Sequence, residues 1–410
     1  MIAGICAKPH AAERFHDTYD IDRKLGSGAF GAVFAVRQKG SESPSPALAV
    51  KVMDLCSEGY AADEDQINAK RCQRVWKEAE MLQKGRGMAH VLQCHSLHLE
   101  AGLAYLVMER AQCSLLHAIE ALPRKTETTL KRFVREMLQG LAELHASGIV
   151  HRDVKPDNFM CFGPGSVVKL CDFGLATLTP AGGVRGICGT PPFMSPEMVR
   201  WCPYDARADV WAVGVIVYAM LLGEFPYMPE TQTSSAMKAA IADGKVAPSF
   251  LPSLALQGCG IPGPSPAASA FLRATLSRRP KDRCSARAAL ESRFLAETCR
   301  RSAASPESEA SLAPALESAK RLGVFGLPSE VPMPSTPHTH HLERRLAELQ
   351  ARRPPSPMKH APRGGAAWRA YMPPALELAD SEGSTRASGS ARPSPAGSNA
   401  VSPSVRRSGA

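Results

Sequence analysis

One segment of the sequence, GIVHRDVKPDNFM at residues 148–160, places several charged and amide side chains between two apolar runs. Asp153 can accept a hydroxyl proton, Lys155 can neutralise charge on a moving phosphoryl group, and Asn158 can bind a metal ion. A little further on, Asp172 follows a short apolar strand pattern and offers carboxylate oxygens, which suit Mg²⁺. A solvated loop would also explain the polar residues, but such loops seldom lie between runs this apolar. We therefore interpret these residues as parts of one catalytic site.

A lysine in the middle of an apolar strand needs an anionic partner. Lys51 lies within ALAVKVMDL, and burying an unpaired ammonium costs on the order of several kcal/mol. The alternative is an edge strand on which Lys51 simply faces water. The next helical pattern offers Glu78 or Glu80 as the partner. Because Leu82 lies one turn after Glu78, a core-facing Leu82 would place Glu78 on the same face and leave Glu80 in solvent.

A glycine-rich segment, LGSGAFGAVF at residues 25–34, contains Gly26, Gly28 and Gly31. A dinucleotide-binding turn has the same spacing, but it requires a helix directly after the third glycine. Here AVFAVRQ follows, which is typical of a strand. A hairpin whose glycines admit backbone N–H groups to phosphates fits better, and a plain glycine turn is the alternative.

The elements that must position these residues fall into two groups along the chain. Strand patterns come first, at residues 32–38, 48–55 and 104–110. Helical patterns dominate afterwards, at residues 129–148, 208–223 and 269–295. The pattern at 208–223 is apolar nearly all round, which predicts a helix buried in a large domain. Strands followed by helices indicate two lobes, of which the larger is helical.

Together these segments resemble the signature set of eukaryotic protein kinases, in the same order from Tyr19 to about Leu295. The resemblance implies an α+β, bilobal kinase fold with an N-lobe at about 19–111 and a C-lobe at about 112–299. Lys155 and the segment GTPPF are similar to serine/threonine kinases, nearest to the calcium/calmodulin-dependent group. The implied function is transfer of the γ-phosphoryl group of Mg-ATP to Ser or Thr hydroxyls of protein substrates.

The resemblance also implies roles for individual residues. Asp153 would be the catalytic base, Lys51 would hold the phosphates and pair with Glu78, and Lys155 would stabilise transferred charge. Asn158 and Asp172 would hold Mg²⁺. The implied ATP-binding positions are Leu25, Gly26, Gly28, Gly31, Val33, Ala49, Lys51, Glu109, Ala111 and Met160. An inactive kinase fold that serves as a scaffold is the alternative, and the complete catalytic set argues against it.

Two further pairings follow from the same resemblance. Asp209, in the buried helix pattern, would anchor the segment that carries Asp153. Glu197 would pair with Arg283. Both pairings would hold the catalytic machinery in place from a distance.

The segment GGVRGICGTPPFMSPE, at residues 182–197, matches the later half of a kinase activation segment, where Thr190 is expected to bond near Asp153. Many family members carry a phosphorylated Thr or Ser at the position of Gly186. Arg152, which pairs with that phosphate in such kinases, therefore lacks its usual partner. One hypothesis is basal activity without phosphorylation at this position. The other is phosphorylation of Thr179, which precedes a proline and could order the loop.

The ends of the chain differ from its centre in composition. Residues 297–410 hold 15 Pro, 17 Ser and 8 Gly among 114 positions, which predicts a disordered tail from about residue 300 to 410. Residues 1–18 are expected to be a flexible N-terminus. One helical pattern in the tail, at 340–353, is interpreted as a transient helix without a role, or alternatively as a segment for a regulatory partner. An acidic insertion at 63–65 is expected to be solvated.

Composition and charge narrow the choice of partners and compartment. The net charge of +10 includes no basic run interleaved with aromatic residues, so nucleic-acid binding is not expected. No window approaches the roughly 18 consecutive apolar residues of a membrane-spanning helix. The 12 cysteines form no CxxC pairs, which is typical of reduced thiols inside the cell. We expect a protein of the cytosol or nucleus.

Overall fold

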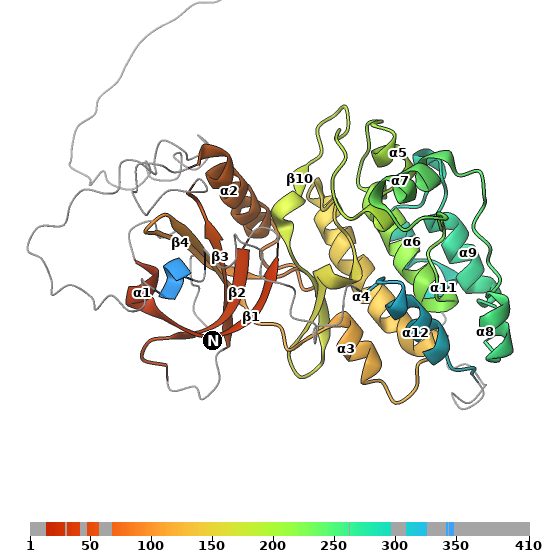
Figure 1. Ribbon diagram of the computed structural model, residues 1–410, viewed down its shortest axis with the longest axis horizontal. Coiled ribbons are helices and arrows are strands. Elements are labelled where there is room, and N and C mark those ends of the chain that lie inside the picture. Colours follow the sequence, from red (N-terminus) through yellow and green to blue (C-terminus); the bar gives the residue numbers. More distant parts are fainter. Residues whose placement is uncertain are drawn as a thin grey trace, which may run out of the picture.

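The chain folds into two lobes of different composition, as a computed structural model of the protein shows (Figure 1). The structure describes residues 14–28, 31–41, 47–56, 68–261, 263–296, 309–325, 342 and 344–347. The smaller lobe is built on one sheet and the larger lobe is mostly helical, which confirms the predicted α+β, bilobal fold. Among the helices in these ranges, none is both long enough and apolar enough to cross a membrane.

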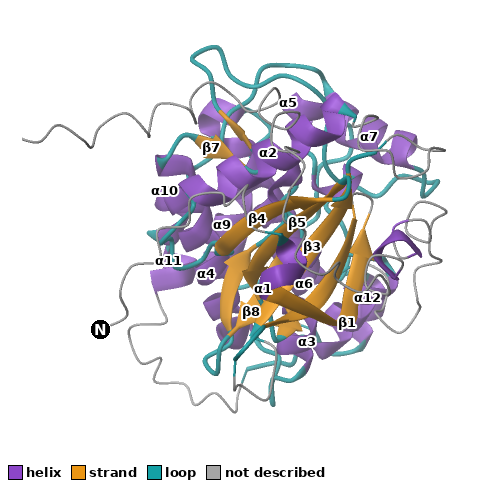
Figure 2. Ribbon diagram, turned by 90° about the vertical axis from the view of Figure 1, so that its left-hand side faces the viewer, coloured by secondary structure: helices purple, strands orange, loops and turns teal. Residues whose placement is uncertain are grey.

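The N-lobe sheet is antiparallel and has its strands in the order β1-β2-β3-β5-β4 (Figure 2). These strands are β1 (Tyr19–Gly28), β2 (Gly31–Gln38), β3 (Leu48–Asp54), β4 (Cys94–Glu100) and β5 (Leu103–Glu109). Successive side chains of a strand point to opposite faces. In β3, Ala49 and Met53 accordingly pack in the main core with α2 (Ala69–Lys84). Val50 and Val52 pack in a second cluster, on the face that we call the outer face of the sheet.

The C-lobe is assembled around α6, which is buried along nearly its whole length. Gly223 ends α6 with a φ of 70°, a left-handed conformation that a residue without Cβ adopts at little cost. Its helices are α3 (Leu115–Glu120), α4 (Glu127–Ala146), α5 (Pro196–Val199), α6 (Arg207–Leu222), α7 (Ser234–Asp243), α8 (Leu254–Gly258), α9 (Pro266–Thr275), α10 (Ala286–Leu290) and α11 (Arg293–Ala296). Its short strands are β6 (Cys113–Ser114), β7 (Ile149–Val150), β8 (Phe159–Phe162), β9 (Val167–Leu170) and β10 (Thr177–Leu178).

The flexible stretch predicted for residues 1–18 is wrong for its last four residues. Phe15–Thr18 form α1, and the fully buried ring of Phe15 stacks on Tyr19 and Tyr105, with centroids 5.4 and 4.3 Å apart. These contacts place α1 on the outer face of the N-lobe sheet (Figure 2). A single aromatic residue ahead of the first strand leaves no periodic signal in the sequence from which its burial could be predicted.

The disordered tail predicted for residues 300–410 is wrong for two segments. Residues 309–325 pack on the C-lobe, where Ala315 and Ala319 of α12 (Ala313–Arg321) are fully buried. In the helical pattern at 340–353, Leu342 and Leu346 are buried in the second cluster on the outer face of the N-lobe sheet, so a free transient helix is wrong there. The acidic insertion at 63–65 lies outside the described residues.

Candidate active site

The side chain of Lys51 links both lobes through two carboxylates. Its Nζ lies 2.6 Å from Oε1 of Glu78 on α2 and 3.0 Å from Oδ1 of Asp172 in the C-lobe. Glu80 lies at the surface instead, 3.8 Å from Lys84. The structure thus brings together the three charged residues that the sequence placed 27 and 121 positions apart.

Burial and charge act in opposite directions on this cluster. Burial opposes the charged form of Lys51, but the carboxylates of Glu78 and Asp172 outweigh it and hold the pKa of Lys51 above its ordinary value. Burial likewise opposes ionisation of Asp172, but the neighbouring ammonium of Lys51 holds the pKa of Asp172 below its usual range. At neutral pH the site therefore presents a charged lysine beside an ionised aspartate.

Asp153 lies at the centre of a second cluster in the loop after β7. Its Oδ1 accepts hydrogen bonds from the backbone N–H and the hydroxyl of Thr190, at 2.9 and 2.8 Å. Its Oδ2 lies 3.0 Å from Nζ of Lys155 and 3.2 Å from Nδ2 of Asn158. Lys155 also donates to the Thr190 hydroxyl at 3.0 Å. Three residues implied by the sequence therefore meet around the carboxylate of Asp153.

The loop that carries Asp153 is held in a strained conformation. Arg152 has a φ of 69°, and Asp172 in the neighbouring loop has a φ of 57°, both uncommon for residues other than glycine. The carboxylate of Asp209 on α6 accepts hydrogen bonds from the backbone N–H groups of His151 and Arg152, each at 2.9 Å. These bonds hold the strained turn in place. Asp209 also lies 2.9 Å from Nε2 of His145.

Asp209 is ionised despite full burial. Burial opposes its charge, but the hydrogen bond with His145 and the backbone N–H of His151 outweigh that effect and hold the pKa of Asp209 below its ordinary value. A charged anchor makes stronger hydrogen bonds to the loop than a neutral one.

The activation segment approaches the catalytic loop more closely than a side chain would allow. At Gly189, with a φ of 91°, a Cβ would lie 2.4 Å from the carbonyl oxygen of Arg152. Glycine at this position is therefore required for Thr190 to reach Asp153. Two prolines and a phenylalanine follow in the short 3₁₀ turn Pro191–Phe193, and Pro196 begins α5.

Glu197 forms a buried, two-pronged ion pair with Arg283. Nη1 and Nη2 of Arg283 lie 2.6 and 3.0 Å from the two carboxylate oxygens. The guanidinium also lies over the ring of Trp211, 5.0 Å from its centroid, and donates to the backbone at Ser277. The end of the activation segment is thereby fixed to the helical core.

Arg152 is engaged by protein groups, whereas the kinase resemblance implies a phosphate as its partner. Its Nε donates to the carbonyl of Leu175 at 2.7 Å, and Tyr204 lies against a later part of the same activation segment. The Tyr204 hydroxyl donates to the carbonyl of Gly186 at 3.1 Å, and the backbones of Tyr204 and Val184 exchange two hydrogen bonds. Burial raises the pKa of Tyr204 to about 12, so its hydroxyl keeps the proton that it donates.

The sequence reasoning missed Tyr204 as a functional residue. Its one signal is its place in WCPYDARADVW, just before the helix that carries Asp209. Nothing in that spacing indicates that its side chain turns back to Gly186, 18 positions earlier. Thr179 lies directly after β10, where its N–H donates to the carbonyl of Gly148 at 2.8 Å.

Most of the implied ATP-binding residues lie on strands of the N-lobe sheet, whereas Met160 lies on β8 of the C-lobe. Gly26, Gly28 and Gly31 lie in the β1–β2 hairpin rather than before a helix, and Leu25 is exposed on β1. Ala49 on β3 is paired with Met108 on β5 and packs in the main core, against which the half-buried side chains of the remaining positions pack. These positions are Val33, Ala111 and Met160.

Glu109, one of the implied ATP-binding positions, also has a structural role. Its carboxylate lies 2.7 and 2.8 Å from Nζ of Lys169 and accepts the backbone N–H of Gln93 at 2.7 Å. The carboxylate is thereby occupied within the protein, and the backbone N–H groups of Glu109 and Arg110 donate to the carbonyls of Gln93 and Ala47 at 3.1 and 3.3 Å.

The family model and the relatives that match this chain are all protein kinases. The protein kinase domain family matches residues 19–295. The chain is 36% identical to CBL-interacting protein kinase 4 of Oryza sativa subsp. japonica over 217 residues, which cover 51% of this chain and 45% of that protein. It is 31% identical to calcium/calmodulin-dependent protein kinase type II of Caenorhabditis elegans, covering 54% of this chain and 30% of that protein.

A human relative, serine/threonine-protein kinase H2, is 33% identical over 222 residues, which cover 52% of this chain and 54% of that protein. The matched part of the chain thus spans about half or less of the length of these curated relatives. Their names confirm the expected similarity to serine/threonine kinases with calcium/calmodulin-dependent members.

Proposed function

This chain belongs to the protein kinase domain family, and from that premise we propose that it transfers the γ-phosphoryl group of Mg-ATP to Ser or Thr hydroxyls of protein substrates. The observation that carries the proposal is the convergence on Asp153 of Lys155, Asn158 and Thr190. Asp153 is placed to accept the proton of a hydroxyl that enters beside Thr190. Lys155, 3.0 Å away, is placed to stabilise the charge that passes between donor and acceptor.

Asn158 and Asp172 fit a Mg²⁺ site by donor type and position. The amide nitrogen of Asn158 is used in hydrogen bonds to Asp153, so its oxygen is the atom that could bind a cation. Asp172 is ionised and its side chain is 43% exposed. A backbone hydrogen bond of 2.8 Å from Cys171 to Asn158 holds the two loops together. Bound Mg²⁺ would neutralise the phosphate charge at this point.

Lys51 would orient the phosphates from the N-lobe side. Its ion pair with Glu78 fixes the ammonium, and Glu78 in turn depends on the position of α2. We propose that Leu25, Val33, Ala49, Met160 and the backbone of residues 109–111 enclose the adenine, and that the hairpin glycines cover the phosphates.

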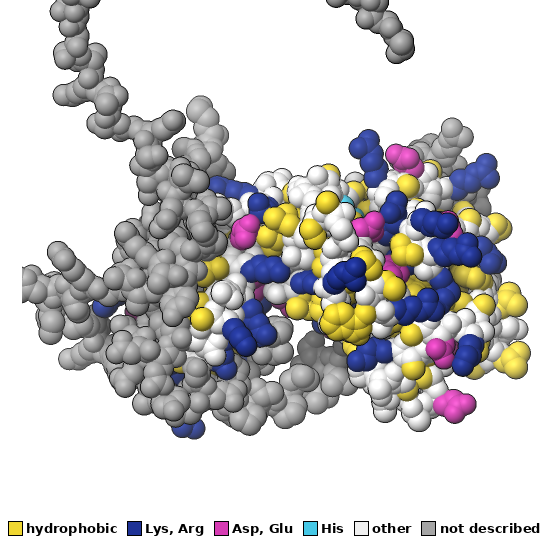
Figure 3. Space-filling view, turned by 90° about the horizontal axis from the view of Figure 1, so that it is seen from above, with side chains coloured by type: hydrophobic (Ala, Val, Ile, Leu, Met, Phe, Trp, Pro, Cys, Tyr) yellow, Lys and Arg dark blue, Asp and Glu magenta, His cyan; other side chains and the backbone are white. Residues whose placement is uncertain are grey.

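The surface beside the activation segment favours acidic acceptor peptides. Basic side chains outnumber acidic ones on the face of the C-lobe seen in Figure 3. In and just after the activation segment, Arg185 and Arg200 are exposed. Opposite charge on a peptide raises its association rate and its selectivity. We propose that Ser/Thr peptides with acidic neighbours are better substrates than those with basic neighbours.

The proposed activity is tested with the full chain made in bacteria and treated with a phosphatase that is then removed. We expect transfer from Mg-ATP to Ser and Thr peptides on an array, but not to Tyr peptides, with higher signals for acidic ones. The Asp153→Asn protein is the blank. No transfer above that blank, with or without phosphatase treatment, would instead favour a scaffold. Transfer by the untreated protein but not by the phosphatase-treated protein would contradict only the hypothesis of basal activity without phosphorylation, and not the proposed kinase activity.

Tyr204→Phe is expected to lower kcat/KM of the phosphatase-treated protein by about fivefold to tenfold, because it removes the hydrogen bond, worth roughly 1 kcal/mol, that holds the carbonyl of Gly186. Steady-state assays with one array-derived peptide measure the change. Tyr105→Phe is the matched control, since the Tyr105 hydroxyl is buried without a hydrogen-bond partner among the described residues.

A second arm separates this mechanism from phosphorylation of Thr179. If a tyrosine hydroxyl holds the loop, Thr179→Ala leaves kcat/KM within about twofold, as expected for a substitution that removes no buried contact. A Thr179→Ala protein that is inactive, together with an unaffected Tyr204→Phe protein, would contradict the proposal and favour phosphorylation of Thr179.

A further inference from the structure

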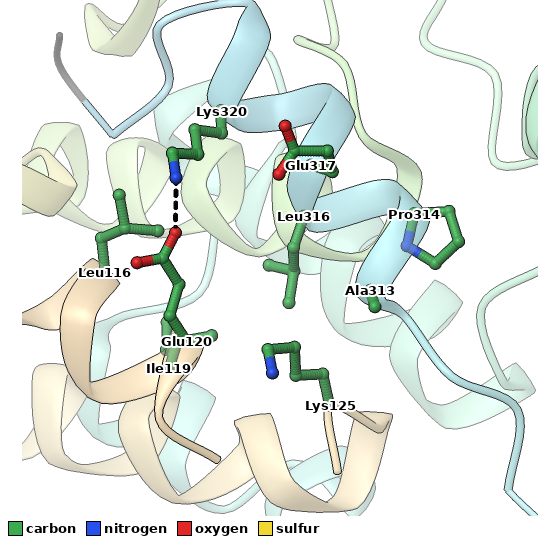
Figure 4. A pocket seen from close by; sticks show the side chains of 9 residues that line it. All are labelled: Leu116, Ile119, Glu120, Lys125, Ala313, Pro314, Leu316, Glu317 and Lys320. Carbon is green, nitrogen blue, oxygen red and sulfur yellow. Dashed lines mark hydrogen bonds and ion pairs between the residues drawn. The ribbon is translucent and has the colours of Figure 1, made fainter. Parts of the chain in front are cut away.

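The tail of the chain is anchored on both lobes. On the C-lobe, the N–H of Leu312 donates to the carbonyl of Lys125 at 2.6 Å, and Lys320 of α12 lies 2.7 Å from Glu120 of α3. Figure 4 shows this ion pair beside the apolar cavity of about 370 Å³ that lies between the two helices. On the N-lobe, residues 342 and 344–347 lie on the outer face of the sheet (Figure 1).

The N-lobe anchor combines apolar and charged contacts. Leu342 and Leu346, four positions apart, lie on one side of a helical turn, and both are buried in the second cluster. Between them Arg345 is buried as well, with its Nη1 2.7 Å from Oδ1 of Asp54 and its Nη2 2.7 Å from the carbonyl of Ala101. The adjacent Arg344 is exposed. A specific side chain, rather than general charge, makes this contact.

Arg345 binds one group at the end of β3 and one in the β4–β5 turn. These two segments meet the start of α2 at a junction. The N–H of Leu55 donates to the carbonyl of Gly102 at 3.0 Å, and the N–H of Asn68 donates to the carbonyl of Leu55 at 2.8 Å. Asn68 is the N-cap of α2, and its side chain accepts from the N–H groups of Lys70 and Arg71. The end of β3, the β4–β5 turn and the start of α2 therefore form one hydrogen-bonded unit.

Arg345 links two parts of this unit, because it binds both Asp54 and Ala101. Ala101 has a φ of 50° and is followed by Gly102 in a tight turn, and its carbonyl accepts from Arg345. Asp54 receives a second hydrogen bond from the N–H of Cys56 at 2.9 Å. Removal of the guanidinium would leave the buried carboxylate of Asp54 with less compensation at the end of β3.

We propose that the outer face of the N-lobe sheet is a docking site for the Leu342–Arg345–Leu346 motif of the same chain, and that Arg345 is a positioning residue for α2 and hence for Glu78. Docking in cis is favoured because α12 already fixes the preceding part of the tail on the C-lobe, which raises the local concentration of the motif. The inference rests on the proposed function only for its effect on the Lys51–Glu78 pair.

The test compares full-length Arg345→Ala with Arg344→Ala, which removes the same charge from the exposed neighbour. Amide hydrogen exchange is measured without nucleotide. In Arg345→Ala we expect exchange about tenfold faster at the β4–β5 turn and the first two turns of α2, with α6 unchanged, because the opening is local. Arg345→Lys keeps the charge but cannot bridge both acceptors, and is expected to give an intermediate rate in the same segments.

Other results would overturn the proposal. Equal exchange in the two alanine variants would show that the guanidinium does not hold the junction. Faster exchange in α6 as well would show a general structural role, and a dependence on protein concentration would show docking between copies. Arg345→Ala should also lower kcat by about threefold to tenfold through misplacement of Glu78. The exchange arm stands even for a protein without kinase activity, so the two failures are distinguishable.

Discussion

Asp153→Asn is expected to lower kcat for peptide phosphorylation by about a thousandfold or more, within the range reported for loss of a general base. Asparagine keeps the shape of the side chain, and its carbonyl oxygen can still accept from Thr190, which now bonds at 2.8 and 2.9 Å. It cannot take up the proton of the acceptor hydroxyl. Rapid-quench or steady-state assays at saturating Mg-ATP measure the loss.

Nucleotide binding separates a catalytic defect from a folding defect in this variant. The Asp153→Asn substitution leaves unchanged the residues proposed to hold Mg-ATP, such as Lys51 and Asp172. The rise in melting temperature on addition of Mg-ATP should therefore be retained. Asp157→Asn makes the same change at an exposed position of the same loop and serves as the control. Undiminished activity of Asp153→Asn would refute the assignment of the base.

Arg283→Ala is expected to lower the free energy of unfolding by about 3–5 kcal/mol, because it leaves the carboxylate of Glu197 buried and unpaired. The side chain of Arg283 is fully buried, so solvent cannot replace its charge. Urea denaturation followed by far-UV circular dichroism measures the change, and the melting temperature should fall by about 10 °C.

A neighbouring arginine supplies the comparison for this second variant. Arg287→Ala removes an exposed guanidinium four positions away and should change stability by no more than about 0.5 kcal/mol. Glu197→Gln, which keeps the shape of the acid, completes a double-mutant cycle. A coupling energy near zero between Glu197 and Arg283 would contradict a stabilising ion pair.

The catalytic cluster was accessible to sequence reasoning because short-range spacing encodes it. Asp153, Lys155 and Asn158 lie within six consecutive positions, and the strand before Asp172 is a clear apolar run. Glu78 was chosen over Glu80 from the position of Leu82 on one helix. Each of these inferences uses the period of a single helix or strand.

The elements that were missed depend on contacts between distant positions. Arg345 meets Asp54 across 291 positions, and the tail that carries it is so rich in proline and serine that composition alone predicts disorder. Phe15 is buried by stacking on Tyr105, far along the chain. Neither contact has a local period. Composition averages over a long segment, whereas a few well-placed leucines and one arginine suffice to anchor it.

The hydrogen bonds of Tyr204 have a consequence for signalling. A loop held by phosphate can be released by a phosphatase, whereas the bond from the Tyr204 hydroxyl to Gly186 forms as the chain folds and has no covalent group to remove. The amount of active enzyme would then follow synthesis and degradation rather than the balance of an upstream kinase and a phosphatase. A cell could change the output of such an enzyme over the lifetime of the protein, but not within seconds at this loop.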